Sequence, residues 1–205
     1  MFFGLRSYCF LICVLMVSSA RAGFILNIDL STVNQVTISA TTELSAATVT
    51  NGNDGTGVYL QDFFTGSLPY FAINSSAGNS LVYFNSTSDG SPRISKGATE
   101  FGLNIYSMDN GTPNFPSFTN GVQAFKGSAT WNLSATQYAA FQAAPLSGGD
   151  VYAFAYTVSQ LNGGPKVIGQ YSVSGISAVP EPTSIAIFGL GALGMGYLAR
   201  RKRKV

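Results

Sequence analysis

The sequence predicts an all-β fold: a single β-sandwich domain, jelly-roll-like or related, with one short helix. Three observations predict it. Short runs rich in β-branched and aromatic residues recur along the chain, and clusters of Gly, Asn, Ser and Pro separate them. One stretch has the capping residues and composition of a short helix. Short strands bounded by turn residues are typical of a sandwich or a barrel.

The first 22 residues have the features of a secretory signal peptide. Arg6 is the charge of a short n-region, residues 8–17 form an apolar h-region, and Ala20 and Ala22 are small residues where a signal peptidase recognises its substrate. Cleavage after Ala22 is therefore predicted. The alternative, an N-terminal membrane anchor, is disfavoured because ten apolar residues are too few to span a bilayer.

Loss of that segment removes whole classes of chemistry. Both cysteines, Cys9 and Cys13, lie within it, and the chain contains no His. The mature protein therefore has no disulfide framework, no Cys or His metal site, and no Cys-His or Ser-His catalysis. We expect no cofactor.

The predicted domain, residues 23–178, is lightly charged and acidic. It has four cations and eight anions, a net charge of −4, whereas the whole chain is formally +2 because of its basic tail. This balance argues against nucleic acid as a partner. Solubility must come from Ser, Thr, Asn and Gly.

Nine runs fit strands, in chain order 24–30, 33–40, 58–64, 70–74, 81–85, 101–107, 122–133, 150–160 and 167–176. Alternation in the first run predicts that Phe24, Leu26, Ile28 and Leu30 share one side.

The run 150–160 has the clearest alternation of all. It sets large residues on one face against small residues on the other, which predicts one face in the core and one closely covered. The large residues are Tyr152, Phe154, Tyr156 and Val158, and the small ones are Ala153, Ala155 and Thr157.

One helix is predicted between two strands. Ser134 and Gln137 have the spacing of a capping box, and residues 135–144 are good helix formers. Tyr138 and Phe141, with Gln142 beside them, lie along one side, and Pro145 ends the helix. No function is assigned to it.

The C-terminal tail, residues 179–205, has three parts in order. Pro180, Glu181 and Pro182 form a short motif that proline keeps extended. Residues 184–199 follow as a predicted transmembrane helix without charge. Its core of 15 residues from Ile185 to Ala199 spans roughly 22 Å, short for a bilayer core of roughly 30 Å, and Thr183, Ser184 and a snorkelling Arg200 bring the segment nearer to spanning. A basic cluster ends the tail and is expected to stop in the cytoplasm: Arg200, Arg201, Lys202, Arg203 and Lys204.

This order of motif, apolar helix and basic cluster resembles the PEP-CTERM sorting signal of bacterial exported proteins. The resemblance is confined to the tail and implies no fold for the rest. It implies an exosortase, a membrane-embedded protease, that cuts near Pro180–Pro182 after transient anchoring in the inner membrane. It also implies a place at the cell surface or outside the cell, among exopolysaccharide and biofilm. The alternative is a C-terminal anchor that is never processed.

Three function classes stay open for the domain. A non-enzymatic surface or matrix protein is favoured, because the chain lacks His and any catalytic motif. A hydrolase that uses only carboxylates would need two acids roughly 5–10 Å apart, and no pair stands out. A carbohydrate-binding module would stack sugars on exposed aromatics from the set Trp131, Tyr59, Tyr70, Tyr83 and Tyr106, although Trp131 alternates in step with Phe125 and Ala129, which favours the core.

The loop 51–57 offers Asn53 and Asp54 as oxygen ligands for a cation such as Ca²⁺. It lacks the spacing and the closing Glu of an EF-hand loop. A plain turn is therefore favoured, and no metal site is predicted.

Overall fold

The structure, a computed structural model, describes residues 23–50, 52–66, 68–76, 80–86, 91–97, 99–108, 116–145, 147–155, 157 and 166–176. The predicted signal peptide and tail helix lie outside these residues. The elements are β1 (Phe24–Asp29), β2 (Gln35–Ala40), β3 (Val58–Leu60), β4 (Phe71–Asn74), β5 (Val82–Tyr83), β6 (Arg93–Lys96), β7 (Leu103–Tyr106), β8 (Phe125–Lys126), β9 (Ser128–Asn132), α1 (Ala135–Gln142), β10 (Gly149–Ala153) and β11 (Val167–Ser174).

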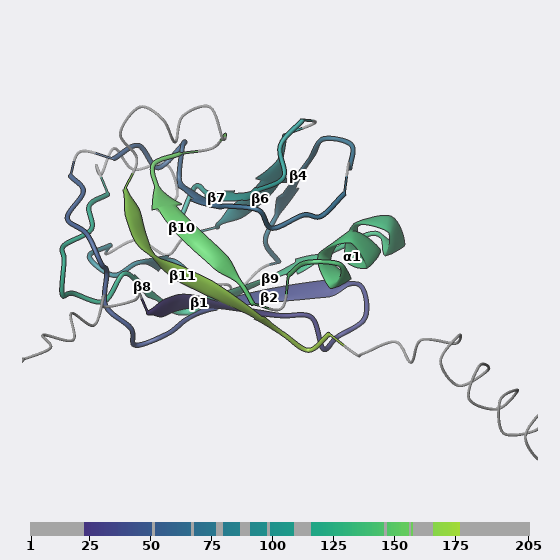
Figure 1. The fold of residues 1–205 in the computed structure, drawn as a ribbon, viewed down its shortest axis with the longest axis horizontal. Helices are drawn as coiled ribbons and strands as arrows, with labels where there is room; N and C mark the ends of the chain where they lie inside the picture. Colours follow the sequence, from purple (N-terminus) through teal and green to yellow (C-terminus); the bar gives the residue numbers. More distant parts are fainter. Residues whose placement is uncertain are drawn as a thin grey trace, which may run out of the picture.

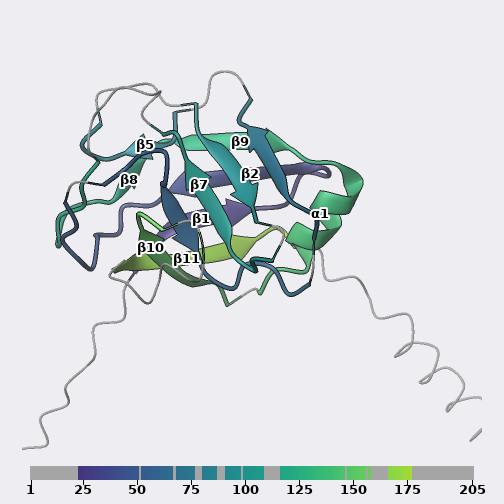
Figure 2. The same cartoon turned by 90° about the horizontal axis from the view of Figure 1, so that it is seen from above.

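Nine strands form one sheet in the order β4-β6-β7-β3-β10-β11-β1-β2-β9, and β5 pairs separately with β8. Neighbours in the large sheet are antiparallel, except for β1 and β11, which are parallel. The sheet curls, so that β4, β6 and β7 lie across from β1, β2 and β9 (Figures 1 and 2). An apolar core fills the space between these two halves.

The two end strands of this sheet come close to each other. The backbone N–H of Ser76, just after β4, donates to the carbonyl of Thr130 in β9 at 2.8 Å, and Ser80 N–H donates to Ser128 O at 2.9 Å. The indole N–H of Trp131 in β9 also reaches across, to the carbonyl of Pro92 before β6, at 3.2 Å. The all-β prediction is confirmed. The strands nevertheless form one nearly closed sheet, because β3, β10 and β11 connect the halves that a sandwich would keep apart.

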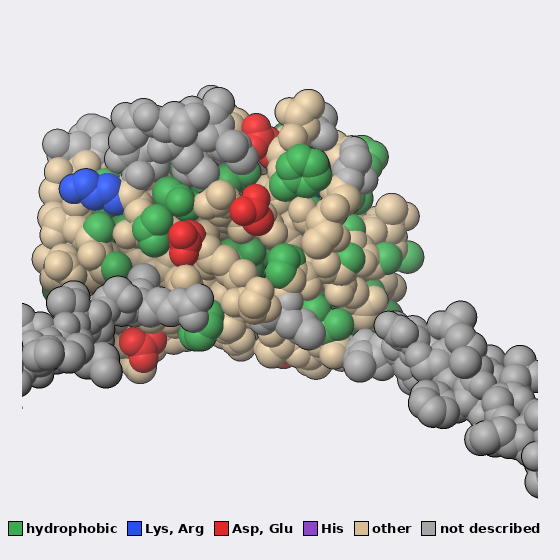
Figure 3. Space-filling view, in the orientation of Figure 1, with side chains coloured by type: hydrophobic (Ala, Val, Ile, Leu, Met, Phe, Trp, Pro, Cys, Tyr) green, Lys and Arg blue, Asp and Glu red, His purple; other side chains and the backbone are tan. Residues whose placement is uncertain are grey.

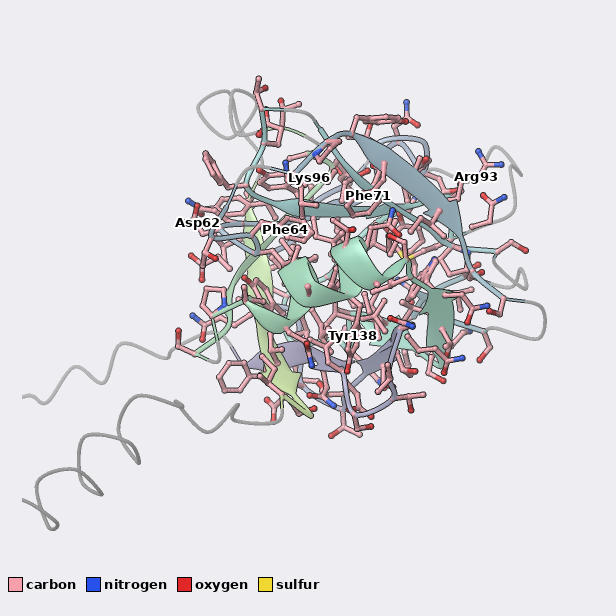
Figure 4. The ribbon with its side chains drawn as sticks, turned by 90° about the vertical axis from the view of Figure 1, so that its right-hand side faces the viewer. Asp62, Phe64, Phe71, Arg93, Lys96 and Tyr138 are labelled. Carbon is pink, nitrogen blue, oxygen red and sulfur yellow. The ribbon has the colours of Figure 1, made fainter. Side chains whose placement is uncertain are left out.

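The helix α1 lies across one end of the curled sheet (Figure 4). Its predicted capping box is confirmed: Ser134 N–H donates to Gln137 Oε1 at 2.8 Å, and Gln137 N–H donates to Ser134 Oγ at 3.3 Å. Tyr138 and Phe141 are its buried residues, as the sequence predicted. The helix thus presents one aromatic side to the core.

Aromatic clusters fill both ends of the core. Under α1, the Phe141 ring lies 5.1 Å from Phe63 and 5.3 Å from Phe64, and Phe63 lies 5.6 Å from Tyr171. At the other end, near β5 and β8 (Figure 2), Phe118 packs against three rings at 5.4 to 5.7 Å: Tyr83, Phe125 and Phe154. Edge-on and tilted ring pairs of this kind add to the stability gained from burial.

Several predicted strands are shorter than expected; the run 58–64, for example, forms a strand only from Val58 to Leu60. Gly127, at φ +79°, splits the run 122–133 into β8 and β9. Phe154, at φ +55°, lies just beyond the end of β10. Ala153 and Ala155 are buried while Tyr152 and Phe154 are partly exposed, so the small residues face the core. The predicted partners Tyr156 and Val158 lie outside the described residues.

Two further differences concern the exposure of Phe24 and the strand β6. Phe24 is 45% exposed, whereas Leu26, Ile28 and Leu30 are buried as predicted. The cause is a shift in the β1–β11 register between Phe24 and Leu26, which breaks the alternation. The sequence analysis also missed β6, a four-residue strand that begins and ends with a cation.

The outer face of β11, β1, β2 and β9 is held by uncharged polar pairs. Gln35 Nε2 donates to Asn132 Oδ1 at 3.0 Å, and the hydroxyls of Thr37 and Thr130 lie 2.9 Å apart. Further along, Ser172 Oγ donates to Asn27 Oδ1 at 3.1 Å. Cross-strand hydroxyl and amide pairs stabilise a sheet without relying on charge.

Phe141→Ala tests the aromatic cluster under α1. It removes a fully buried ring, so we expect a loss of about 3–5 kcal/mol in the free energy of unfolding. Urea unfolding of a purified Gly23–Val179 fragment would measure it. The control is Phe101→Ala, at a ring that is 48% exposed. Equal effects of the two substitutions would contradict the assigned role of Phe141.

Candidate functional site

The residues predicted to act in sorting and export lie outside the part of the chain that the structure describes. They are the motif Pro180, Glu181 and Pro182, the basic cluster Arg200, Arg201, Lys202, Arg203 and Lys204, and the signal-peptidase residues Ala20 and Ala22. In the described segments, no helix has the length and apolar character to cross a membrane. The structure does describe the end of the last strand, which is the described element nearest in the chain to the predicted tail.

That strand is β11. The carbonyl of Ser174, the last residue of the strand, accepts a hydrogen bond from Leu30 N–H at 3.0 Å. Gly175 follows at φ +75°, and a Cβ there would lie 2.4 Å from the backbone nitrogen of Ser31. Only glycine fits such a conformation and such a close approach. The chain therefore leaves the domain through a tightly packed turn.

Leu30 also joins this exit to the helix. Its carbonyl accepts a hydrogen bond from the Tyr138 hydroxyl of α1 at 2.7 Å. The carbonyl of Asn34 accepts one from Leu133 N–H, just before α1, at 2.8 Å. The end of β11, the β1–β2 turn (residues 31–34) and the start of α1 are thus bonded together; we call this region the tail junction.

The β1–β2 turn forms the exposed part of the tail junction. The Asp29 carboxylate accepts hydrogen bonds from the backbone N–H of Ser31 at 2.9 Å and from its hydroxyl at 3.0 Å. Asn34 has φ +59°, a conformation that Asn tolerates better than most residues. Val33 at the tip is 71% exposed.

Most of the predicted sugar-stacking aromatics are not available at the surface. Trp131, Tyr59 and Tyr83 are at most 1% exposed, so the core interpretation of Trp131 is confirmed. Tyr106 is partly buried, whereas Tyr70, just before β4, is 66% exposed. Any aromatic platform would have to be built around Tyr70.

The side-chain oxygens of Asn53 and Asp54, in the loop 51–57, accept hydrogen bonds from backbone N–H groups. Asn53 Oδ1 accepts Gly55 N–H at 2.8 Å, and Asp54 Oδ1 accepts Met108 N–H at 2.9 Å. Asn51 lies outside the described residues. Across the described residues, no three His, Cys, Asp or Glu side chains gather in a group that could hold a metal ion.

Two carboxylates lie near the same tyrosines. Burial raises the pKa of Tyr171, and Asp62 and Asp150 raise it further. The pKa of Tyr152 is raised by burial, then by Asp150 and Asp62. Asp150 also accepts a hydrogen bond from Gln170 Nε2 at 3.1 Å. Figure 3 shows acidic side chains across the face that carries β10 and β11.

The sequence analysis missed a buried polar group around Lys96, in β6. Lys96 is 1% exposed, and its Nζ donates to the carbonyls of Leu68 at 3.1 Å and Gly97 at 3.0 Å. It lies 5.8 Å from the centre of the Phe64 ring (Figure 4). Burial lowers the pKa of Lys96, and Glu100 opposes that shift. The alternation of the strand could have predicted this burial, because Lys96 lies two residues after the buried Ile94 and so on the same face.

Glu100 also binds Tyr59. The Tyr59 hydroxyl donates to Glu100 Oε2 at 3.1 Å and accepts Gly102 N–H at 3.0 Å. Burial, then Glu100, raises the pKa of Tyr59. These contacts fix the turn between β6 and β7 rather than expose a reactive group.

A comparison with known families identifies the tail. Residues 178–204 match the family model of the PEP-CTERM protein-sorting motif. The tail is a PEP-CTERM sorting motif. The match includes Pro180, Glu181, Pro182 and the five cations, and it confirms the resemblance inferred from the sequence. No curated protein and no solved structure matches the chain.

The PEP-CTERM motif implies an exported protein that is anchored in a membrane by its C-terminus before processing. It also implies an exosortase, a membrane protein, as the processing partner. The tail junction is the part of the folded domain nearest to that motif in the chain.

The raised pKa values of Tyr59 and Tyr171 predict a loss of stability in alkali. Both are held above the ordinary value of 10.0 in the folded state, so unfolded tyrosines ionise first as the pH rises. Stability is then fully present below pH 10 and falls above it, by up to about 1.4 kcal/mol per tyrosine per pH unit. Urea unfolding between pH 8 and 11 would measure this. Tyr171→Phe should flatten the decline, and an unchanged slope would contradict the assignment.

Proposed function

We propose that this chain is a non-enzymatic protein that an exosortase processes and delivers to the cell surface or the extracellular matrix. There its β domain has a structural or adhesive role in association with exopolysaccharide and biofilm. The observation that supports processing and delivery by an exosortase is the PEP-CTERM motif at residues 178–204. The predicted signal peptide at residues 1–22 supports export by the same route.

Two features support a structural role for the domain. The chain has no His, and both cysteines precede Gly23, so the mature sequence offers neither a Cys nucleophile nor a His base. The outer face of β11, β1, β2 and β9 is held by hydroxyl and amide pairs such as Thr37–Thr130. Such pairs are insensitive to salt and to pH near neutrality, which suits a protein exposed to the surroundings.

A carbohydrate-binding module on the same scaffold is the second candidate. Tyr70 is 66% exposed and Phe101 48% exposed. They precede β4 and β7, which flank β6 and are both antiparallel to it, so the two residues lie at the same end of this part of the sheet. Exposed aromatic faces at one end of a sheet can stack on sugar rings. This version of the module uses Tyr70 and Phe101 in place of Trp131.

Processing of the tail is the direct test of the proposal. Protein recovered from the native host should lack the peptide after Pro182 when its C-terminus is examined by mass spectrometry. Glu181→Ala removes the one charge of the motif and should leave the full-length form in the inner membrane. Glu43→Ala, at an exposed Glu of the domain, is the control and should be processed normally. An intact basic C-terminus in mature cells, or normal processing of Glu181→Ala, would refute exosortase sorting.

Affinity electrophoresis with the host's own exopolysaccharide separates the two candidate roles. If the domain is a carbohydrate-binding module, Tyr70→Ala should weaken retardation about ten-fold, equivalent to about 1.4 kcal/mol. Phe24→Ala is the control, because Phe24 is 45% exposed in β1, which is not next to β4 or β7 in the sheet. Absence of retardation with any polysaccharide would leave the structural role as the better account.

A further inference from the structure

We infer that the tail junction is a docking surface for the membrane-embedded protease that processes the tail. The inference rests on the proposed function and adds a second recognition element to the sorting motif. The docking surface consists of the exposed β1–β2 turn and the adjoining exposed side of α1: Ser31, Thr32, Val33, Asn34, Ala135 and Ala139.

The first argument is the length of the connection. Three residues separate Ile176, the last described residue, from Pro180, and the four steps of extended chain span at most about 14 Å. Ile176 packs against the core, and Ser174 is bonded to Leu30, so the start of this connection is fixed to the domain. A protease that binds an extended substrate holds residues on both sides of the bond it cuts. We therefore expect the outer surface of the protease to contact the end of the domain.

The second argument is the direction in which this end faces. β11 ends at the end of the molecule that carries α1 (Figures 1 and 2). Viewed from that end, α1 crosses the middle of the molecule (Figure 4). Leu30 connects the two, since its N–H bonds Ser174 and its carbonyl bonds Tyr138. The β1–β2 turn and α1 are thus bonded to the end of the strand that leads into the motif.

The third argument is the chemistry of the surface. None of its six residues is charged, and α1 contains no charged residue at all. The nearest carboxylate along the chain, Asp29, is already bonded to Ser31. Ala135 and Ala139 are exposed one helical turn apart, and Val33 is 71% exposed. Depletion of charge is typical of the centre of protein–protein interfaces.

The same chemistry argues for the enzyme and against the lipid bilayer as the occupant. Binding to anionic headgroups requires Lys or Arg near the surface, and the docking surface has neither. A single exposed valine buries too little apolar area to hold a domain on a bilayer. A neutral protein surface is the occupant that fits.

The experiment places charge on the docking surface and follows processing in the native host by pulse-chase. The double substitution Val33→Glu with Ala139→Glu should slow cleavage about ten-fold, because an unpaired charge in an interface is costly. The matched control is Thr42→Glu with Thr50→Glu, two exposed positions whose chain neighbours Thr41 and Val49 are bonded to Ile25 and Phe118. The control should be cleaved at the wild-type rate.

A second pair of variants carries ten Gly and Ser residues inserted after Ile176. The spacer lets the protease reach the motif without touching the domain, so the doubly substituted protein should regain the wild-type rate. Recovery would also show that the slow cleavage does not come from misfolding. Wild-type cleavage of the substituted protein without the spacer, or slow cleavage with it, would overturn the inference.

Substitution by Lys at the same two positions distinguishes the enzyme from the bilayer. Docking on a neutral protein surface predicts that Val33→Lys with Ala139→Lys slows cleavage as the Glu pair does. Faster cleavage with Lys and slower with Glu would make anionic lipid the occupant and would overturn the inference. A wild-type chain that is never cleaved would instead refute the proposed function. Failure of the docking inference can thus be distinguished from failure of the proposed function.

Discussion

The parallel pairing of β1 with β11 is the interaction on which the rest of the structure depends. It joins the first strand to the last, with Leu26 opposite Tyr171 and Asp29 opposite Ser174. Without it the large sheet would fall into two parts, β4-β6-β7-β3-β10-β11 and β1-β2-β9, and the curl that encloses the core would be lost. Pairing over so long a sequence separation carries a large entropic cost of loop closure. The sheet therefore becomes continuous only when the chain just before the tail is in place.

In the interior, buried polar side chains donate hydrogen bonds to backbone carbonyls beyond the ends of strands. Asn104 Nδ2 lies within 3.2 Å of three carbonyl oxygens, those of Thr56, Val58 and Ala155. Ala155 follows the left-handed position of Phe154 beyond the end of β10, so Asn104 binds a carbonyl that lies outside the strand. Lys96 does the same for Leu68 and Gly97. Such groups lower the cost of irregular backbone in a buried place.

Local signals carried the sequence predictions that succeeded. The capping box of Ser134 and Gln137 depends on spacing of three residues, and the alternation of Leu26, Ile28 and Leu30 depends on spacing of two. What failed depends on partners distant in the chain. The exposure of Phe24 follows from its register with β11, and the end of β10 coincides with a backbone turn at Phe154 that composition does not reveal. The tail junction itself could not be predicted, because Ser174, Leu30 and Tyr138 meet only after the sheet closes.

The domain and the tail differ sharply in charge. The domain carries few charges, and its outer face is held by neutral pairs, whereas the tail concentrates five cations in succession. Under the proposed processing the signal peptide leaves with Arg6 and Arg21, and the tail leaves with its five cations. A chain that was formally +2 then becomes a domain of net charge −4. A mildly acidic domain is repelled by the anionic surface of a membrane. Under this proposal, cleavage would remove the membrane anchor and the electrostatic attraction of the basic cluster in one step.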